Sequence, residues 1–113
     1  MTDRLAYKLL RPAEWDAFTV AHFAGTAADL GDGFIHLSTA EQLEGTIARH
    51  YADAAELIVL TVDLGAVTEL RWEPSRGGAL FPHLYAPLPR DAVVAVERRS
   101  LQPALPRAEG EEA

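Results

Sequence analysis

Leu57-Ile58-Val59-Leu60-Thr61-Val62 is the strongest structural signal in the chain, because it is almost entirely aliphatic and rich in β-branched residues. A short run of this kind predicts a central strand that is buried on both faces. The turn Asp63-Leu64-Gly65 ends the strand. The other segments must therefore supply the neighbouring strands and the helices that cover the sheet.

Two segments before this run are also typical of strands. Residues 5–10 are apolar and end before Pro12, which cannot donate a hydrogen bond to a sheet. Residues 33–39 alternate in polarity, which places His36 and Ser38 on the same face of a strand. We therefore expect His36 and Ser38 to point in the same direction.

A first helix is predicted from Pro12 to about His22. Proline is favoured in the first turn of a helix, and Trp15 and Phe18 follow at helical spacing, so we expect this helix to bury both rings. Residues 23–33 are rich in Gly and Asp and predict a loop that contains one helical turn.

A second helix is predicted from residue 38 or 39 to about residue 51. Either Ser38 with Glu41 or Thr39 with Gln42 would make a capping box at its start. Three apolar residues then line one face of the helix: Leu43, Ile47 and Tyr51.

Three further strands are predicted after the central run, at residues 68–73, 81–85 and 92–96. Pro82 lacks an N–H group, so we expect residues 81–85 only as an edge or irregular strand. In an extended segment His83 and Tyr85 share a face. The sequence therefore predicts an α+β fold with five or six strands and two main helices.

The 113-residue chain carries 10 Lys and Arg against 17 Asp and Glu, a formal net charge of −7. This balance argues against non-specific binding to nucleic acid or to an anionic membrane. The absence of Cys excludes disulfides, thiolate metal sites and cysteine nucleophiles. We expect one domain at residues 1–102, followed by a flexible acidic tail at 103–113. No membrane span or signal-peptide pattern is seen, so we expect a cytoplasmic protein of undetermined oligomeric state.

Three groups of residues could carry chemistry. Imidazoles bind ligands and transfer protons, glutamates near Gly-rich turns are well placed for loop-borne sites, and guanidinium groups suit phosphate or carboxylate. The candidate catalytic residues are Glu73, His36 and His83. The candidate residues for binding a cofactor or ligand are Ser38, Arg76 and Tyr85.

These residues also have structural interpretations. A histidine in an apolar strand is often a core residue held by one hydrogen bond, and a turn arginine such as Arg76 often pairs with a nearby carboxylate such as Glu73. A metal site built from His36, His50, Glu73 and His83 is a further alternative, although the spacing of these residues matches no known ligand pattern.

Three motifs carry a resemblance to a known family: DGFIHLST at residues 32–39, LRWE at 70–73 and GALFPHLYAPL at 78–88, together with Gln42. The sequence closely resembles the bacterial domain-of-unknown-function 952 family over about residues 5–98. That family is grouped by fold with ADP-ribosyltransferases and RNA 2′-phosphotransferases. The resemblance implies a small split antiparallel sheet with two main helices that grips NAD.

The resemblance also implies roles for individual residues. Glu73 would orient a ribose 2′-hydroxyl and stabilise an oxocarbenium-like transition state, His36 would bind the adenosine ribose, and Arg76 would contact the pyrophosphate. The first strand departs from the superfamily, since Tyr7-Lys8 stands where His-Gly or Arg-Gly is usual.

Three functions are consistent with the sequence, and it leaves open whether the protein is an enzyme. The leading hypothesis is a pocket for a nucleotide or NAD-like ligand, related to ADP-ribosyl or phosphoryl transfer. The alternative is a non-catalytic module for a small ligand or a protein partner, in which the polar residues form a closed network without a cavity. A third is metal-assisted hydrolysis, which requires at least three of the possible ligands to converge.

Overall fold

The computed structural model of the protein describes residues 4–16, 18 and 22–101; the side chains of His22 and Arg76 and the expected tail at 103–113 lie outside the described part. The elements follow in the order β1 (Leu5–Leu10), α1 (Pro12–Asp16), β2 (His22–Phe23), α2 (Ala27–Asp32), β3 (Ile35–His36), α3 (Ala40–His50), β4 (Glu56–Asp63), η1 (Leu64–Ala66), β5 (Leu70–Pro74), η2 (Arg76–Gly78), β6 (Leu80–Leu84), β7 (Leu88–Pro89), η3 (Arg90–Ala92) and β8 (Val93–Ser100). No helix in these ranges has the length and apolar character needed to cross a membrane.

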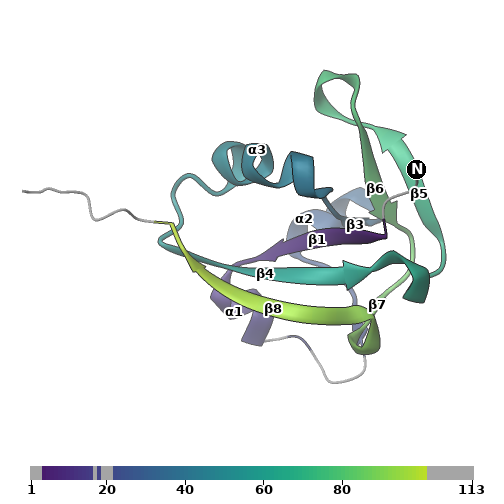
Figure 1. Ribbon diagram of the computed structural model, residues 1–113, viewed down its shortest axis with the longest axis horizontal. Helices are drawn as coiled ribbons and strands as arrows, with labels where there is room; N and C mark the ends of the chain where they lie inside the picture. Colours follow the sequence, from purple (N-terminus) through teal and green to yellow (C-terminus); the bar gives the residue numbers. More distant parts are fainter. Residues whose placement is uncertain (1–3, 17, 19–21, 102–113) are drawn as a thin grey trace, which may run out of the picture.

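The first sheet has the strand order β1–β4–β8, and both pairings are antiparallel (Figure 1). β4 contains the aliphatic run 57–62 and lies in the middle. Its five aliphatic side chains in this run are at most 3% exposed, which confirms the predicted central strand. β1 is an edge strand, and on its free side Tyr7 exchanges two backbone hydrogen bonds with Ser38.

The second sheet has the order β3–β6–β5, also antiparallel. The expectation that Pro82 confines its strand to an edge is wrong, because β6 lies in the middle of this sheet. The Pro82 carbonyl accepts a hydrogen bond from the Leu37 N–H at 3.1 Å. In an antiparallel strand the N–H and C=O of one residue point to the same side. The missing N–H therefore faces the end of the two-residue β3 and removes no bond from the pairing with β5.

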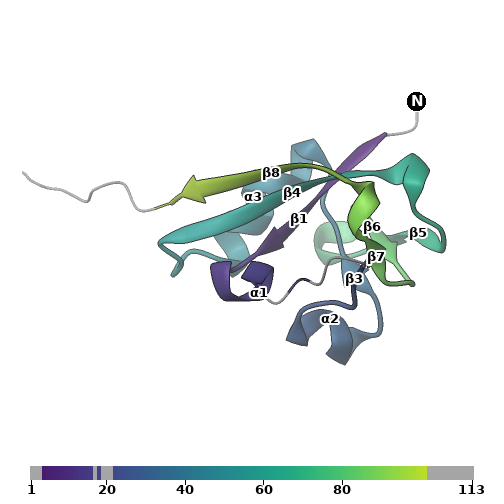
Figure 2. The ribbon, with the colours of Figure 1, turned by 90° about the horizontal axis from the view of Figure 1, so that it is seen from below.

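The two faces of the first sheet carry different partners. α3 packs on one face, where Leu43 and Ile47 join Leu9, Leu57 and Val59 (Figure 1). α1 and α2 lie on the other side (Figure 2). There, Ile35 of β3, Leu84 of β6 and Leu37, which follows β3, complete the larger core with Ile58, Leu60 and Val62.

The helix predicted from Pro12 to His22 is too long. α1 ends at Asp16 and His22 belongs to β2, while residues 17 and 19–21 lie outside the described ranges. Phe18 stacks on Phe23, with ring centroids 4.9 Å apart, and meets Trp15 edge to face at 5.3 Å. Trp15 and Phe18 are only partly buried at the edge of the larger core. Their rings meet in an aromatic cluster with Phe23 and not along one face of a continuous helix.

The short elements agree with the sequence more closely. The helical turn expected between residues 23 and 33 is α2. Of the two possible capping boxes, the one that forms joins Thr39 and Gln42, whose side chains each accept a hydrogen bond from the other residue's backbone N–H. The protein thus has an α+β fold, with two antiparallel three-stranded sheets and few helices in its described part.

Candidate functional site

A cleft of about 720 Å³ lies along the free edge of β1, with residues of α3 and α2 in its walls. Three of the six candidate catalytic and binding residues line it: His36, Ser38 and His83. Glu73 and Tyr85 lie behind His83 and do not line the cleft. The backbone of Arg76 is in η2, but its side chain is outside the described part.

A buried ion pair forms one wall. The Nζ atom of Lys8 lies 2.7 Å from Oδ2 of Asp29, and their side chains are only 4% and 1% exposed. Lys8 comes from β1 on the face that also carries Ala6 and Leu10. A charge in this position has to be paired, because an unpaired buried ammonium group is very costly.

Asp29 is also the third residue of a capping box at the start of α2. Its backbone N–H donates to the Thr26 hydroxyl at 3.2 Å, and its Oδ2 atom accepts from the Thr26 N–H at 2.9 Å. Gly25, with φ of +129°, precedes this turn. A Cβ atom at Gly25 would lie 2.7 Å from the Asp29 Cβ, so glycine is needed both for the backbone conformation and for the close approach.

His36 lies between two carboxylates of α2. Its Nδ1 atom is 2.5 Å from Oδ1 of Asp29, which also accepts the His36 backbone N–H at 3.1 Å. Its Nε2 atom is 2.9 Å from Oδ2 of Asp32, whose side chain is 57% exposed. Carboxylate oxygens only accept hydrogen bonds. Both contacts are therefore satisfied together only when the imidazole of His36 carries two protons.

The charges of this group depend on one another. Burial opposes ionisation of Asp29, but the hydrogen bond with His36 and the nearby Lys8 ammonium outweigh it and hold the Asp29 pKa well below its usual value. Burial lowers the pKa of Lys8 below its usual value of 10.5, although Asp29 acts in the opposite direction. Asp29 is thus a carboxylate at neutral pH and anchors both Lys8 and His36.

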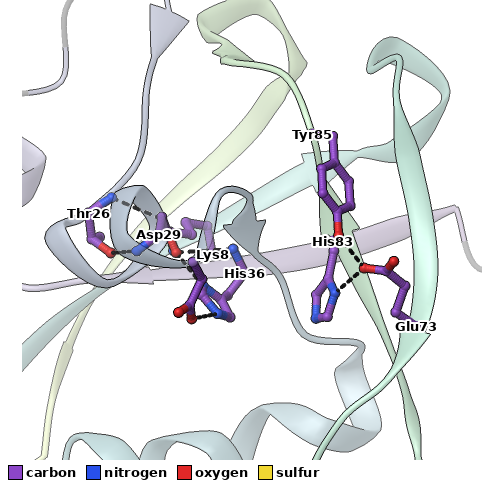
Figure 3. Close-up of polar contacts among 8 residues, drawn as sticks. Lys8, Thr26, Asp29, His36, Glu73, His83 and Tyr85 are labelled. Carbon is purple, nitrogen blue, oxygen red and sulfur yellow. Dashed lines mark hydrogen bonds and ion pairs between the residues drawn. The ribbon is translucent and has the colours of Figure 1, made fainter.

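A second histidine–carboxylate pair is built on β5 and β6. Nδ1 of His83 lies 2.7 Å from Oε1 of Glu73, and the Tyr85 hydroxyl donates to the same oxygen at 2.7 Å (Figure 3). The hydrogen bonds from Tyr85 and His83 lower the pKa of Glu73, and the same bond to Glu73 raises the pKa of Tyr85. Arg71 lies over the Tyr85 ring at 4.8 Å from its centroid.

His83 is the buried member of this pair, with a side chain that is only 8% exposed. The Phe34 ring stacks on it with centroids 4.0 Å apart, and contacts His36 at 4.6 Å. His36 and His83 are opposite each other in the β3–β6 register, with ring centroids 5.8 Å apart. Among the described residues, Nε2 of His83 has no hydrogen-bond partner. The cleft therefore contains a buried imidazole with one nitrogen available to a ligand.

The far end of the cleft carries cations. Arg49 belongs to the last turn of α3 and has no ion-pair partner among the described residues, whereas Arg11 lies 3.3 Å from exposed Asp53 and over the ring of Tyr51. Both arginines line the cleft together with Glu14, whose carboxylate accepts the Arg11 backbone N–H at 2.7 Å. Since α3 has 11 residues, its ends are separated by about 15 Å at 1.5 Å per residue. Arg49, in the last turn, is therefore well separated from the start of α3, which follows His36 in the chain.

The other predicted alternatives can be compared with this geometry. The described residues include no group of three or more His, Asp and Glu that could hold a metal ion. The set His36, His50, Glu73 and His83 thus does not converge as the metal hypothesis requires. Glu73, His83 and Tyr85 form a hydrogen-bonded network of the kind that the non-catalytic alternative expects, while His36, Ser38 and His83 line a cleft. The Ser38 hydroxyl is held by Thr46 at 3.2 Å.

Lys8, Asp29 and Asp32 were missed as site residues in the sequence. A signal for the first two was present. Lys8 interrupts the buried face of an apolar strand, which demands a carboxylate partner, and Thr26 followed by Asp29 at the third position matches a capping box. Gly77 and Gly78, in η2, have positive φ angles of 77° and 82°, a conformation that glycine adopts without strain.

The sequence and the structure were compared with those of known proteins. Residues 9–96 match the family described as protein of unknown function (DUF952). The chain is 47% identical to protein CC0527 from Caulobacter crescentus, whose crystal structure superposes with a TM-score of 0.78 over 83% of this chain and 84% of that one. The solution structure of CC0527 gives a TM-score of 0.74 over 87% and 86%. A search of curated proteins finds no match. The chain therefore belongs to the DUF952 family.

Proposed function

We propose that the cleft binds a nucleotide or an NAD-like dinucleotide. The observation that carries the proposal is that the lining combines two arginines, Arg11 and Arg49, with two histidines, His36 and His83. Guanidinium groups suit the phosphates of such a ligand. Nε2 of His83 offers a hydrogen-bond acceptor to a group of the ligand that carries a proton.

The size and walls of the cleft support the same ligand class. A volume of about 720 Å³ falls within the range of roughly 300–1,000 Å³ that is usual for small-molecule sites. Tyr7, Tyr51 and Phe81 line it, and aromatic rings provide faces on which a purine or nicotinamide ring can stack. The ligand is thus a small molecule with a planar ring and at least one phosphate.

The proposal extends to group transfer on an ADP-ribosyltransferase-like fold, as the family resemblance implies. The split antiparallel sheets of the α+β fold are consistent with it. In this proposal Glu73 acts as a positioning residue, since its carboxylate holds His83 and Tyr85, while His36 and His83 contact the ligand. Fold likeness alone does not transfer chemistry, so binding has to be tested first.

Thermal unfolding with and without NAD or ADP-ribose tests the proposal. A ligand at 100 times its Kd that binds only the folded protein adds about 2.7 kcal/mol, which raises the Tm of a domain of this size by about 10 °C or more. We expect such a shift with at least one of the two compounds. No shift with either compound, at concentrations up to several millimolar, would remove the proposal.

Two arginine variants make the test specific to the cleft. Arg49→Gln removes a cleft cation that has no ion-pair partner in the described structure, so it should weaken binding about tenfold while leaving the unliganded Tm unchanged. Arg98→Gln is the matched control, because Arg98 pairs with Glu56 on the exposed side of β8. Equal affinities of the two variants would show that the ligand binds elsewhere.

A further inference from the structure

The two histidines of the cleft differ in the hydrogen-bond partners of their ring nitrogens. His36 faces a carboxylate oxygen at each ring nitrogen, which requires two N–H donors. His83 faces one carboxylate oxygen, at Nδ1, which places its proton there and leaves a lone pair on Nε2 in the neutral ring. The surroundings thus make one imidazole a proton donor and the other a proton acceptor.

The position of His83 suits a general base. Glu73 fixes its tautomer, and Phe34 stacks on the ring and restricts its rotation. The charged and titratable groups near it are Glu73 and Arg71 on β5, Tyr85 directly after β6, and His36 on β3. A carboxylate at Nδ1 also stabilises the imidazolium that forms when Nε2 takes a proton.

The position of His36 suits a general acid. Its Nδ1–H is held by buried Asp29, whose other oxygen is paired with Lys8. Its Nε2–H points to Asp32, which is mostly exposed and can give way to a ligand oxygen. After His36 loses the Nε2 proton, the neutral ring keeps its hydrogen bond to Asp29. The two roles therefore need no rearrangement of the buried residues.

We propose that His83 and His36 act as the general base and general acid in cleaving a phosphodiester of a nucleotide bound in the cleft. This inference rests on the proposed function. The ring centroids are 5.8 Å apart, so both imidazoles are within reach of one phosphate group. General acid–base catalysis by positioned side chains contributes about 10²–10⁴-fold each.

For a 2′,3′-cyclic nucleotide the steps balance as follows. A water molecule gives one proton to Nε2 of His83 while its oxygen forms a bond to phosphorus. The bond from phosphorus to one ribose oxygen breaks, and that oxygen takes the Nε2 proton of His36. The product is a nucleoside monophosphate, and exchange with solvent returns each histidine to its starting state.

The test is hydrolysis of 2′,3′-cyclic AMP by the full chain in the presence of EDTA, followed by chromatography across pH 4 to 9. The proposal predicts a bell-shaped pH profile and a loss of about 100-fold or more in both His83→Phe and His36→Gln. His83→Gln is a second variant in case the first does not fold. Glu73→Gln should lower kcat about tenfold. It should also shift the acidic limb of the pH profile, which reports the proposed general base His83. Glu56→Gln, a matched control in the exposed pair with Arg98, should behave as wild type.

Several outcomes would overturn the inference: no hydrolysis, activity that EDTA abolishes, or activity retained without the His83 imidazole. Nitrogen-15 NMR gives a readout without substrate, in which the neutral ring of His83 should carry its proton on Nδ1, where Glu73 accepts it. A proton on Nε2 of the neutral ring would also contradict the proposal. If 2′,3′-cyclic AMP or ADP-ribose raises the Tm but 2′,3′-cyclic AMP is not hydrolysed, this inference fails and the proposed binding function stands.

Discussion

Lys8 and Asp29 form an ion pair that is almost completely buried, with Nζ 2.7 Å from Oδ2. Removing one partner leaves the other as an uncompensated buried charge, which costs about 3–5 kcal/mol. We therefore expect Lys8→Met to lower the free energy of unfolding by this amount in urea denaturation. Arg98→Gln, which breaks the exposed pair with Glu56, should cost less than about 1 kcal/mol. Similar losses for both would show that the buried pair is not a major source of stability.

The depressed pKa of Asp29 predicts a specific loss of stability in acid. The unfolded-state pKa is near the usual 3.8, and the folded-state pKa lies well below it. The contribution is therefore fully present above about pH 4 and is lost as the pH falls toward the folded-state value. Within that window Asp29 should contribute a slope of about 1.4 kcal/mol per pH unit. Urea unfolding between pH 4.5 and 2.5 measures it, and Asp29→Asn should lack this part of the slope.

The fold was predictable where the hydrophobic pattern of a segment agrees with its packing in the tertiary structure. The run 57–62 is so apolar that only a strand buried on both sides suits it, and β4 occupies that place. Pro82 misled the prediction because the rule against proline in a central strand assumes a full ladder on both sides, and β3 is too short to need one. The first helix failed because Phe18 packs on Phe23, a contact that helical spacing alone does not reveal.

The candidate site was predictable only in part. Alternation placed His36 on one face of its strand, and the shared face of His83 and Tyr85 agrees with their joint hydrogen bonds to Glu73. Which carboxylate pairs with which histidine depends on the β3–β6 and β5–β6 registers, and a register is set by tertiary packing. The partnership of His83 with Glu73 was therefore out of reach of the sequence, and that of His36 with Asp29 depends on how α2 packs against β3.

The start of α3 offers a test of the capping box. The Thr39 hydroxyl accepts the Gln42 N–H at 3.2 Å, and this bond satisfies a backbone donor that would otherwise lack a partner. Thr39→Ala should lower the free energy of unfolding by about 1 kcal/mol, measured by urea denaturation. Thr39→Ser keeps the oxygen and is the matched control. If Thr39→Ser were as unstable as Thr39→Ala, the methyl group rather than the cap would be responsible.

Tyr51 provides the corresponding test in alkali. Burial raises its pKa to about 12, with smaller contributions from Glu14 and Asp29. Because the folded-state pKa exceeds the unfolded-state value near 10, the stabilisation is complete below pH 10 and is lost as the pH rises toward 12. The ultraviolet absorbance of wild type minus that of Tyr51→Phe isolates its phenolate, which should appear with a midpoint near pH 12. A midpoint near pH 10 would show that the phenol is open to solvent, and the α3 wall of the cleft would then be looser than this packing indicates.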